Sequence, residues 1–159
     1  SPHLEMIVGA LANAGALPVL EKSLRFASAR QRILVNNIAN SDTPDYRPLD
    51  LAVEGFQSEL RRAIETRERD AGAMGMGRGS GPDRALEFQR TREIDFLENG
   101  TIKARPRTPS GNILYHDRNN RDIERMMQDL AENNLAYRTT VELMRRENDT
   151  LRIAITQRP

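Results

Sequence analysis

The chain has 159 residues, with 24 Lys and Arg against 23 Asp and Glu, which gives a formal net charge of +1. This balance argues against a dedicated nucleic-acid binder, which carries a concentrated basic excess, and the absence of cysteine excludes disulfide bonds and thiolate metal sites. Aromatic residues make up only 4% of the chain, so we expect one mostly helical domain with a thin core of leucine, isoleucine and methionine.

The first residues carry no complete export or membrane signal. Ser1–Glu5 read as a cloning remnant, so the natural start is expected at Met6. The apolar run Ile7–Ala12 imitates a signal peptide, but it is too short and no Lys or Arg lies between Met6 and Lys22. No stretch approaches the roughly 20 apolar residues of a membrane span. If the protein leaves the cytosol, we expect it to do so without a cleaved signal peptide.

Residues 18–40 are predicted to form a long first helix. Pro18 suits the first turn, where its missing N–H is not needed, and apolar residues then recur in alternating steps of three and four, the spacing of a coiled-coil seam. The helix is expected to end near Asn40, because Ser41–Pro44 offers competing side-chain hydrogen bonds and then a proline. The seam consists of Leu17, Leu20, Leu24, Ala27, Leu34 and Ile38, with Gln31 in the one polar slot.

The middle of the chain begins with a second, shorter helix. Phe56, Leu60 and Ile64 fall at helical spacing in a segment rich in Arg and Glu. The glycine-rich stretch Ala71–Pro82 cannot sustain a helix or a core, and it lacks the Gly-Lys-Ser/Thr ending of a phosphate loop. We therefore expect a flexible linker there.

A β-hairpin is predicted over residues 94–104. Asn99-Gly100 lies between two short runs that carry apolar residues, and this pair favours a type I′ turn. Ile113–Tyr115 is a candidate for a further short strand, and the basic segment Lys103–Arg107 is interpreted as solvated surface.

The strongest periodic pattern runs from Asp122 to about residue 157. Asn119 or Asn120 can cap this helix, which would be roughly 50 Å long, more than a globule of this size needs. Asn134 and Asn148 fill two slots of its stripe, either as buried seam residues that fix register or at a solvated edge. The apolar positions are Ile123, Met127, Leu130, Tyr137, Val141, Met144, Leu151 and Ile155.

These elements predict a mainly α fold of one domain, in which antiparallel N- and C-terminal helices form a coiled-coil-like pair beside a small irregular middle region with a β-hairpin. The expected divisions are 6–47 for the first helix and its turn, 48–118 for the middle region and 119–159 for the last helix. Such an arrangement suits assembly better than catalysis.

No catalytic constellation is visible in the sequence. His3 and His116 are the only histidines, and no His/Glu spacing suits a metal. Carboxylates are interleaved with arginines, as in Glu65–Asp70, which is typical of a salt-bridged exposed helix. We therefore expect no enzymatic activity, no cofactor and no small-molecule substrate.

The end of the first helix carries a family resemblance. The segment Asn36-Asn-Ile-Ala-Asn-Ser-Asp-Thr-Pro-Asp-Tyr-Arg47 is similar to the N-terminal signature of bacterial flagellar axial (rod and hook) proteins, roughly Asn-Ile-Ala-Asn-x-x-Thr-Pro-Gly-Tyr-Lys. The adjoining Pro48–Asp50 and the distant blocks 119–124 and 130–137 resemble the proximal-rod version. Asp45 replaces the usual Gly and would carry a penalty if the turn needs a positive φ. The matching positions are Asn36, Asn37, Ile38, Ala39, Asn40, Thr43, Pro44 and Tyr46.

The resemblance implies a structural subunit of the basal-body rod, lying in the periplasmic space. Its implied partners are further copies of itself, other rod subunits, the protein at the junction of rod and MS ring, and the flagellar type III export apparatus. The terminal helices would pair within a subunit and pack against neighbours in a helical tube. We expect Leu20, Leu24, Leu34 and Ile38 to bury against Leu130, Tyr137, Val141, Met144 and Leu151, with Ile155 continuing the stripe.

Other interpretations remain open. Phe56 and Leu60 have the Phe-x-x-x-apolar spacing of an export-gate signal, but the same spacing is one face of any amphipathic helix, which we favour. The chain could instead be a coiled-coil adaptor or export chaperone that is never exported, although such a protein has no obvious reason to carry the Thr43–Tyr46 turn. It could also be a short distal-rod or hook relative, whose block at 119–124 would be expected to differ.

Overall fold

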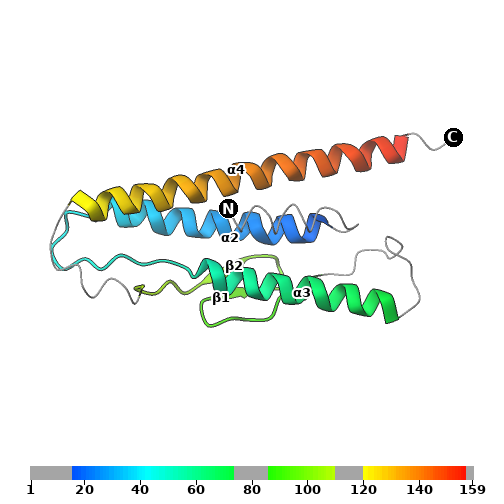
Figure 1. Cartoon of the computed structure of the whole chain (residues 1–159), viewed down its shortest axis with the longest axis horizontal. Helices are drawn as coiled ribbons and strands as arrows, with labels where there is room; N and C mark the ends of the chain where they lie inside the picture. Colours follow the sequence, from blue (N-terminus) through cyan, green and yellow to red (C-terminus); the bar gives the residue numbers. More distant parts are fainter. Residues whose placement is uncertain (1–15, 74–85, 110–119, 157–159) are drawn as a thin grey trace.

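The computed structural model describes residues 16–73, 86–109 and 120–156, and within them the chain is mainly helical (Figure 1). The predicted fold class is confirmed. The elements are α2 (Ala16–Ala39), α3 (Val53–Ala73), β1 (Ile94–Phe96), β2 (Ile102–Ala104) and α4 (Asn120–Thr156). No helix in these three ranges is both long and apolar enough to cross a membrane.

Helix α2 lies between two layers. On one side it packs along α4, and on the other it faces α3 and the hairpin (Figure 1). Helices α2 and α4 are antiparallel, because in Figure 1 the cyan end of α2 lies beside the yellow end of α4. The 37 residues of α4 exceed the 24 of α2, so the last turns of α4 extend past the first described residue of α2.

The core between α2, α3 and the hairpin is built on phenylalanine. The chain has four Phe, and they form one ladder. The Phe26 and Phe56 rings stack with centroids 4.1 Å apart, Phe56 and Phe88 lie 5.6 Å apart, and Phe88 meets Phe96 edge-on at 4.7 Å. The expectation of a thin aliphatic core is therefore incomplete. The few phenylalanine rings come from four separate segments and pack together in one place.

Helix α3 fits the predicted second helix. Phe56 and Leu60 are fully buried in the core, and Ile64 packs against it. The helix continues to Ala73, beyond the expected start of the linker at Ala71.

The predicted hairpin is confirmed, but its turn differs from the expectation. Strands β1 and β2 pair antiparallel, with Phe96 opposite Ile102. A type I′ turn needs a positive φ at both central residues, yet only Gly100 of the Asn-Gly pair has one, 78°. The Gly100 N–H donates to the Leu97 carbonyl at 2.8 Å, and the Leu97 N–H donates to the Thr101 carbonyl at 2.9 Å. The loop is therefore longer than a type I′ turn, and consists of a tight turn followed by a left-handed glycine.

Several expectations lie outside the described residues. They are the cloning remnant and signal-like run within 1–15, the glycine-rich stretch from residue 74 onward, the strand at Ile113–Tyr115, the cap at Asn119 and the two histidines.

Candidate assembly surfaces

The motif at the end of α2 is held together by the side-chain amide of Asn37, which is buried. Its Nδ2 donates to the Leu49 carbonyl at 2.6 Å, and its Oδ1 accepts from the Leu49 N–H at 3.0 Å. The same Oδ1 accepts from the Tyr46 hydroxyl at 2.9 Å. The Asn37 amide thus bonds both backbone groups of Leu49, as a neighbouring β-strand would, and fixes the path of the chain as it leaves the helix.

The neighbouring motif residues close the turn. Asn36 donates from Nδ2 to the Tyr46 hydroxyl at 3.2 Å, and Asn40 donates from Nδ2 to the Asn36 carbonyl at 2.8 Å. The Thr43 N–H donates to the Asn40 carbonyl at 3.0 Å, and the Tyr46 N–H donates to the Thr43 carbonyl at 3.2 Å. These contacts give each of the three asparagines and the tyrosine of the motif a structural role in the turn.

The turn does require a left-handed residue. Asp45 has φ of 59°, the region that favours glycine. The departure from the family signature therefore falls at the position where glycine is structurally preferred. Asp is among the few side chains that tolerate this conformation.

About half of the motif faces outward. Asn36, Ala39, Thr43 and Pro44 are exposed, whereas Ile38 is half-buried. The polar groups of the motif act mainly within the chain, and its exposed residues are the ones available to a neighbour.

The segment after the motif is tied to α2 by an ion pair. Arg30 donates from Nε and Nη2 to the two carboxylate oxygens of Asp50 at 2.8 and 2.7 Å, and both side chains are largely buried. The Asp50 backbone forms a bridge with Arg107, at 2.9 and 3.0 Å. Asp129 on α4 lies in the same electrostatic environment: burial raises its carboxyl pKa above the ordinary value, Asp50 and Glu132 add to that shift, and Arg30 and Arg125 oppose it.

The α2–α4 contact is centred on polar and small residues of α4. Asn133 and Thr140, one heptad apart, are the α4 residues classed as buried in the described part of that helix. The Asn133 Nδ2 donates to the Ala27 carbonyl at 2.9 Å and to the Gln31 Oε1 at 2.8 Å. Ser23, on the facing side of α2, is fully buried, and its hydroxyl has no hydrogen-bond partner in the structure.

Asn133 was missed by the sequence reasoning. Of the two asparagines that were considered for the seam, Asn134 is half-buried and Asn148 is exposed. Two features of the sequence point to Asn133. It lies one heptad before Thr140, and α2 has a polar residue in its seam, Gln31, to which Asn133 is hydrogen-bonded in the structure.

The predicted pairing residues divide into three groups. Leu20 and Leu34 are buried, and Leu20 packs against Leu143 and Met144. Leu24, Ile38, Leu130, Val141 and Met144 are half-buried. Tyr137, Leu151 and Ile155 are 36%, 44% and 75% exposed.

The expected burial of Tyr137 and Leu151 against α2 therefore does not occur within the single chain. The apolar stripe of α4 is rotated toward one edge of the contact, because the face that meets α2 carries Asn133 and Thr140. A role of these exposed side chains in contacts between subunits stays a prediction.

Among the described residues no group of His, Cys, Asp and Glu is placed to hold a metal ion. What the structure offers instead is a long helix pair with an internally bonded turn at one end and apolar side chains left on the surface. These features define the class: a mainly helical protein built on a long antiparallel helix pair.

Comparison with known proteins gives the family. The chain is 26% identical to the flagellar basal body rod protein FlgB of Bacillus subtilis (strain 168) over 147 residues, which is 90% of this chain and 95% of that protein. It is 30% identical to FlgB of Escherichia coli (strain K12) over 131 residues, 81% and 84% of the two chains. It is 32% identical to FlgB of Borrelia hermsii over 124 residues, 77% and 82%. No family model matches the chain, and no solved structure gives a significant match.

The chain belongs to the family of flagellar basal body rod proteins named FlgB. Because the matches extend over most of both chains, the similarity reaches far beyond the motif alone.

Proposed function

We propose that this protein is a structural, non-enzymatic subunit of the bacterial flagellar basal-body rod. The observation that carries the proposal is the similarity to rod proteins over most of their length. The internally bonded turn supports it, because the motif that resembles the axial signature forms a specific structure around Asn37.

In this proposal the subunits assemble through their terminal helices into a helical tube. An open-ended tube needs heterologous contacts that do not close on themselves. The exposed apolar side chains of Tyr137, Leu151 and Ile155 supply unsatisfied surface for such contacts. Burying them would add roughly 25 cal/mol for each Å² removed from water.

The proposed partners are other copies of this chain, other rod subunits, the protein that joins the rod to the MS ring, and the type III export apparatus. The proposed location is the rod in the periplasmic space. The chain would act as one domain, with 6–47 and 119–159 as axial segments and 48–118 as the middle region.

Phe56 and Leu60 support the core interpretation over an export signal. Both are fully buried, and Phe56 stacks on Phe26. An export receptor could read them only in an unfolded chain, whereas their packing accounts for their spacing without one.

The test is deletion of the gene in its host, followed by electron microscopy of isolated basal bodies. Rings without a rod, restored by the intact gene, are the expected result. Intact rods and normal swimming after deletion would sink the proposal and favour an adaptor.

A matched pair of variants tests the assembly step. Leu151→Asp changes an exposed residue of the α4 stripe, and Leu97→Asp changes a similarly exposed leucine at the hairpin. We expect L151D to be folded but unable to complete rods, and L97D to assemble. Equal assembly by both would contradict a role for the stripe. Leu34→Asp is a poorer probe because Leu34 is buried and the change would unfold the pair.

A further inference from the structure

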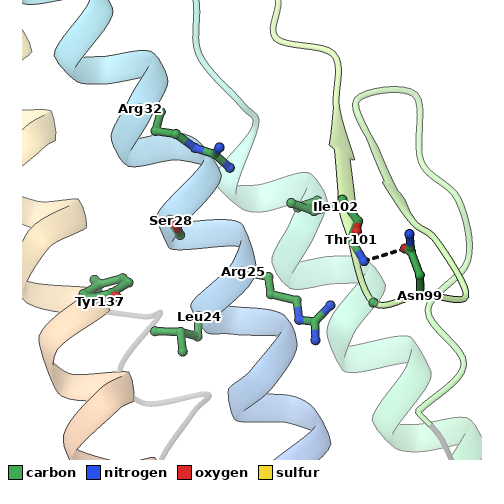
Figure 2. A pocket seen from close by; sticks show the side chains of 9 residues that line it. Leu24, Arg25, Ser28, Arg32, Asn99, Thr101, Ile102 and Tyr137 are labelled. Atoms are coloured by element: carbon green, nitrogen blue, oxygen red, sulfur yellow. Dashed lines mark hydrogen bonds between the residues drawn. The ribbon is translucent and has the colours of Figure 1, made fainter.

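A groove of about 310 Å³ lies along the open face of α2. Figure 2 shows its floor formed by side chains of α2, with Tyr137 of α4 on one side and the hairpin tip on the other. The lining residues are Leu24, Arg25, Ser28, Arg32, Tyr137 and the tip segment 99–102.

The groove combines apolar and cationic groups. Leu24 and Ile102 supply apolar surface, and none of the described residues that line the groove is a carboxylate. Arg25 is held in place, because it pairs with Glu21 and its guanidinium lies where a side chain at Gly100 would be. Arg32 is exposed and forms no ion pair with any residue that the structure describes. The groove therefore suits an occupant with an apolar side chain next to carboxylates.

The chain carries a surface of that description on α4. Glu124, Gln128, Glu132 and Leu135 are all exposed and succeed one another in steps of four, four and three, which places them along one ridge of the helix. Leu135 is 58% exposed. At ~1.5 Å per residue the two carboxylates of this α4 ridge lie about 12 Å apart along the axis, and the two arginines of the groove about 10 Å apart.

We propose that the α4 ridge of one copy of this chain docks into the α2 groove of the next, with Leu135 entering the apolar floor and the glutamates facing Arg25 and Arg32. The contact joins two different patches. A bound pair therefore still has one free groove and one free ridge, and further copies can add at either end to form a row. The inference rests on the proposed function, because it specifies how neighbouring rod subunits meet.

Disulfide trapping tests the contact directly, since the native chain has no cysteine. One full-length chain carries Ser28→Cys in the groove, and a second carries Leu135→Cys on the ridge. Mixing them under mild oxidation should give a disulfide-linked dimer. The control replaces the first chain with Ser58→Cys, which is exposed on α3 away from both patches, and should give at least about tenfold less product.

Charge reversal adds a second readout. Arg32→Glu in the Ser28→Cys chain should reduce cross-linking with the Leu135→Cys chain at least about tenfold, and high salt should reduce the unreversed reaction because exposed charges are screened. Circular dichroism verifies that the variants are folded. Equal cross-linking by the Ser28→Cys and Ser58→Cys chains, or no effect of Arg32→Glu, would overturn the proposal.

The same cysteine pair in cells separates the two proposals. If basal bodies contain the protein and deletion removes the rod, but groove and ridge cysteines do not cross-link, the docking inference fails while the rod function stands. If deletion leaves rods intact, the rod function fails whatever the purified chains do. Cross-linking between two Ser28→Cys chains alone would show a symmetric contact and overturn the row of copies.

Discussion

Replacing Asn37 with Ala should destabilise the chain more than any other single change in the motif. The substitution removes two hydrogen bonds to the Leu49 backbone and one to the Tyr46 hydroxyl. At about 0.5–1.5 kcal/mol for each net hydrogen bond, the expected loss is about 2–4 kcal/mol. For a chain of this size the loss corresponds to a fall in Tm of roughly 5–15 °C.

The assay is urea unfolding followed by circular dichroism, together with hydrogen exchange of the Leu49 amide. In the native chain that amide is bonded to the Asn37 Oδ1, so it should be protected, and N37A should remove the protection. Tyr46→Phe is the graded comparison, because it removes the hydroxyl alone and should cost about 1 kcal/mol. Asn40→Ala is the control at the exposed end of the same turn.

The reasoning would be refuted by an N37A variant that loses less than about 0.5 kcal/mol, the range of an ordinary surface substitution. It would also be refuted if Leu49 exchanged at the native rate while other amides were unchanged. Either result would mean that the Asn37 amide does not hold the turn.

Three further changes have defined outcomes. Asp45→Gly should raise the free energy of unfolding by up to about 1 kcal/mol, because the left-handed φ at this position favours glycine, and Asp45→Ala should lower it; urea midpoints give the sign. Asn133→Ala should cost about 1–3 kcal/mol, because it leaves the Ala27 carbonyl and Gln31 without their shared donor; a loss below that of an exposed Asn148→Ala control would contradict this. Asp129→Asn should stabilise the chain at neutral pH. A raised carboxyl pKa means that the folded state binds the proton more tightly, so stability is lost as pH rises through that pKa, and the gain from the variant should vanish below about pH 4 in melts across pH.

The local elements could be predicted because their signals lie within a few residues of each other. The step of three and four, the proline at 18 and the Asn-Thr-Pro turn locate α2 and its end. Phe56 and Leu60 locate α3, and Asn99-Gly100 locates the hairpin. Even the positive φ of Asp45 could be anticipated, because the family signature has glycine at this position.

The contact face of α4 could not be predicted from periodicity. The apolar stripe indicated the helix but not which edge meets α2, and the structure turns the helix so that Asn133 and Thr140 face inward. The partner surface decides this, since small residues such as Ser23 and Ala27 bring the helices together where the Asn133 amide can reach the Ala27 carbonyl.

The sequence by itself determined the helices, the turn and the hairpin, because each depends on propensities and spacings of neighbouring residues. Only the tertiary structure decided the phenylalanine ladder, the bond from the Asn37 amide to Leu49 and the groove beside Arg32. Each of these depends on segments distant in sequence, so its geometry is set by how the layers pack. The same packing leaves Tyr137 and Leu151 exposed, and a neighbouring subunit rather than the chain itself would have to bury them.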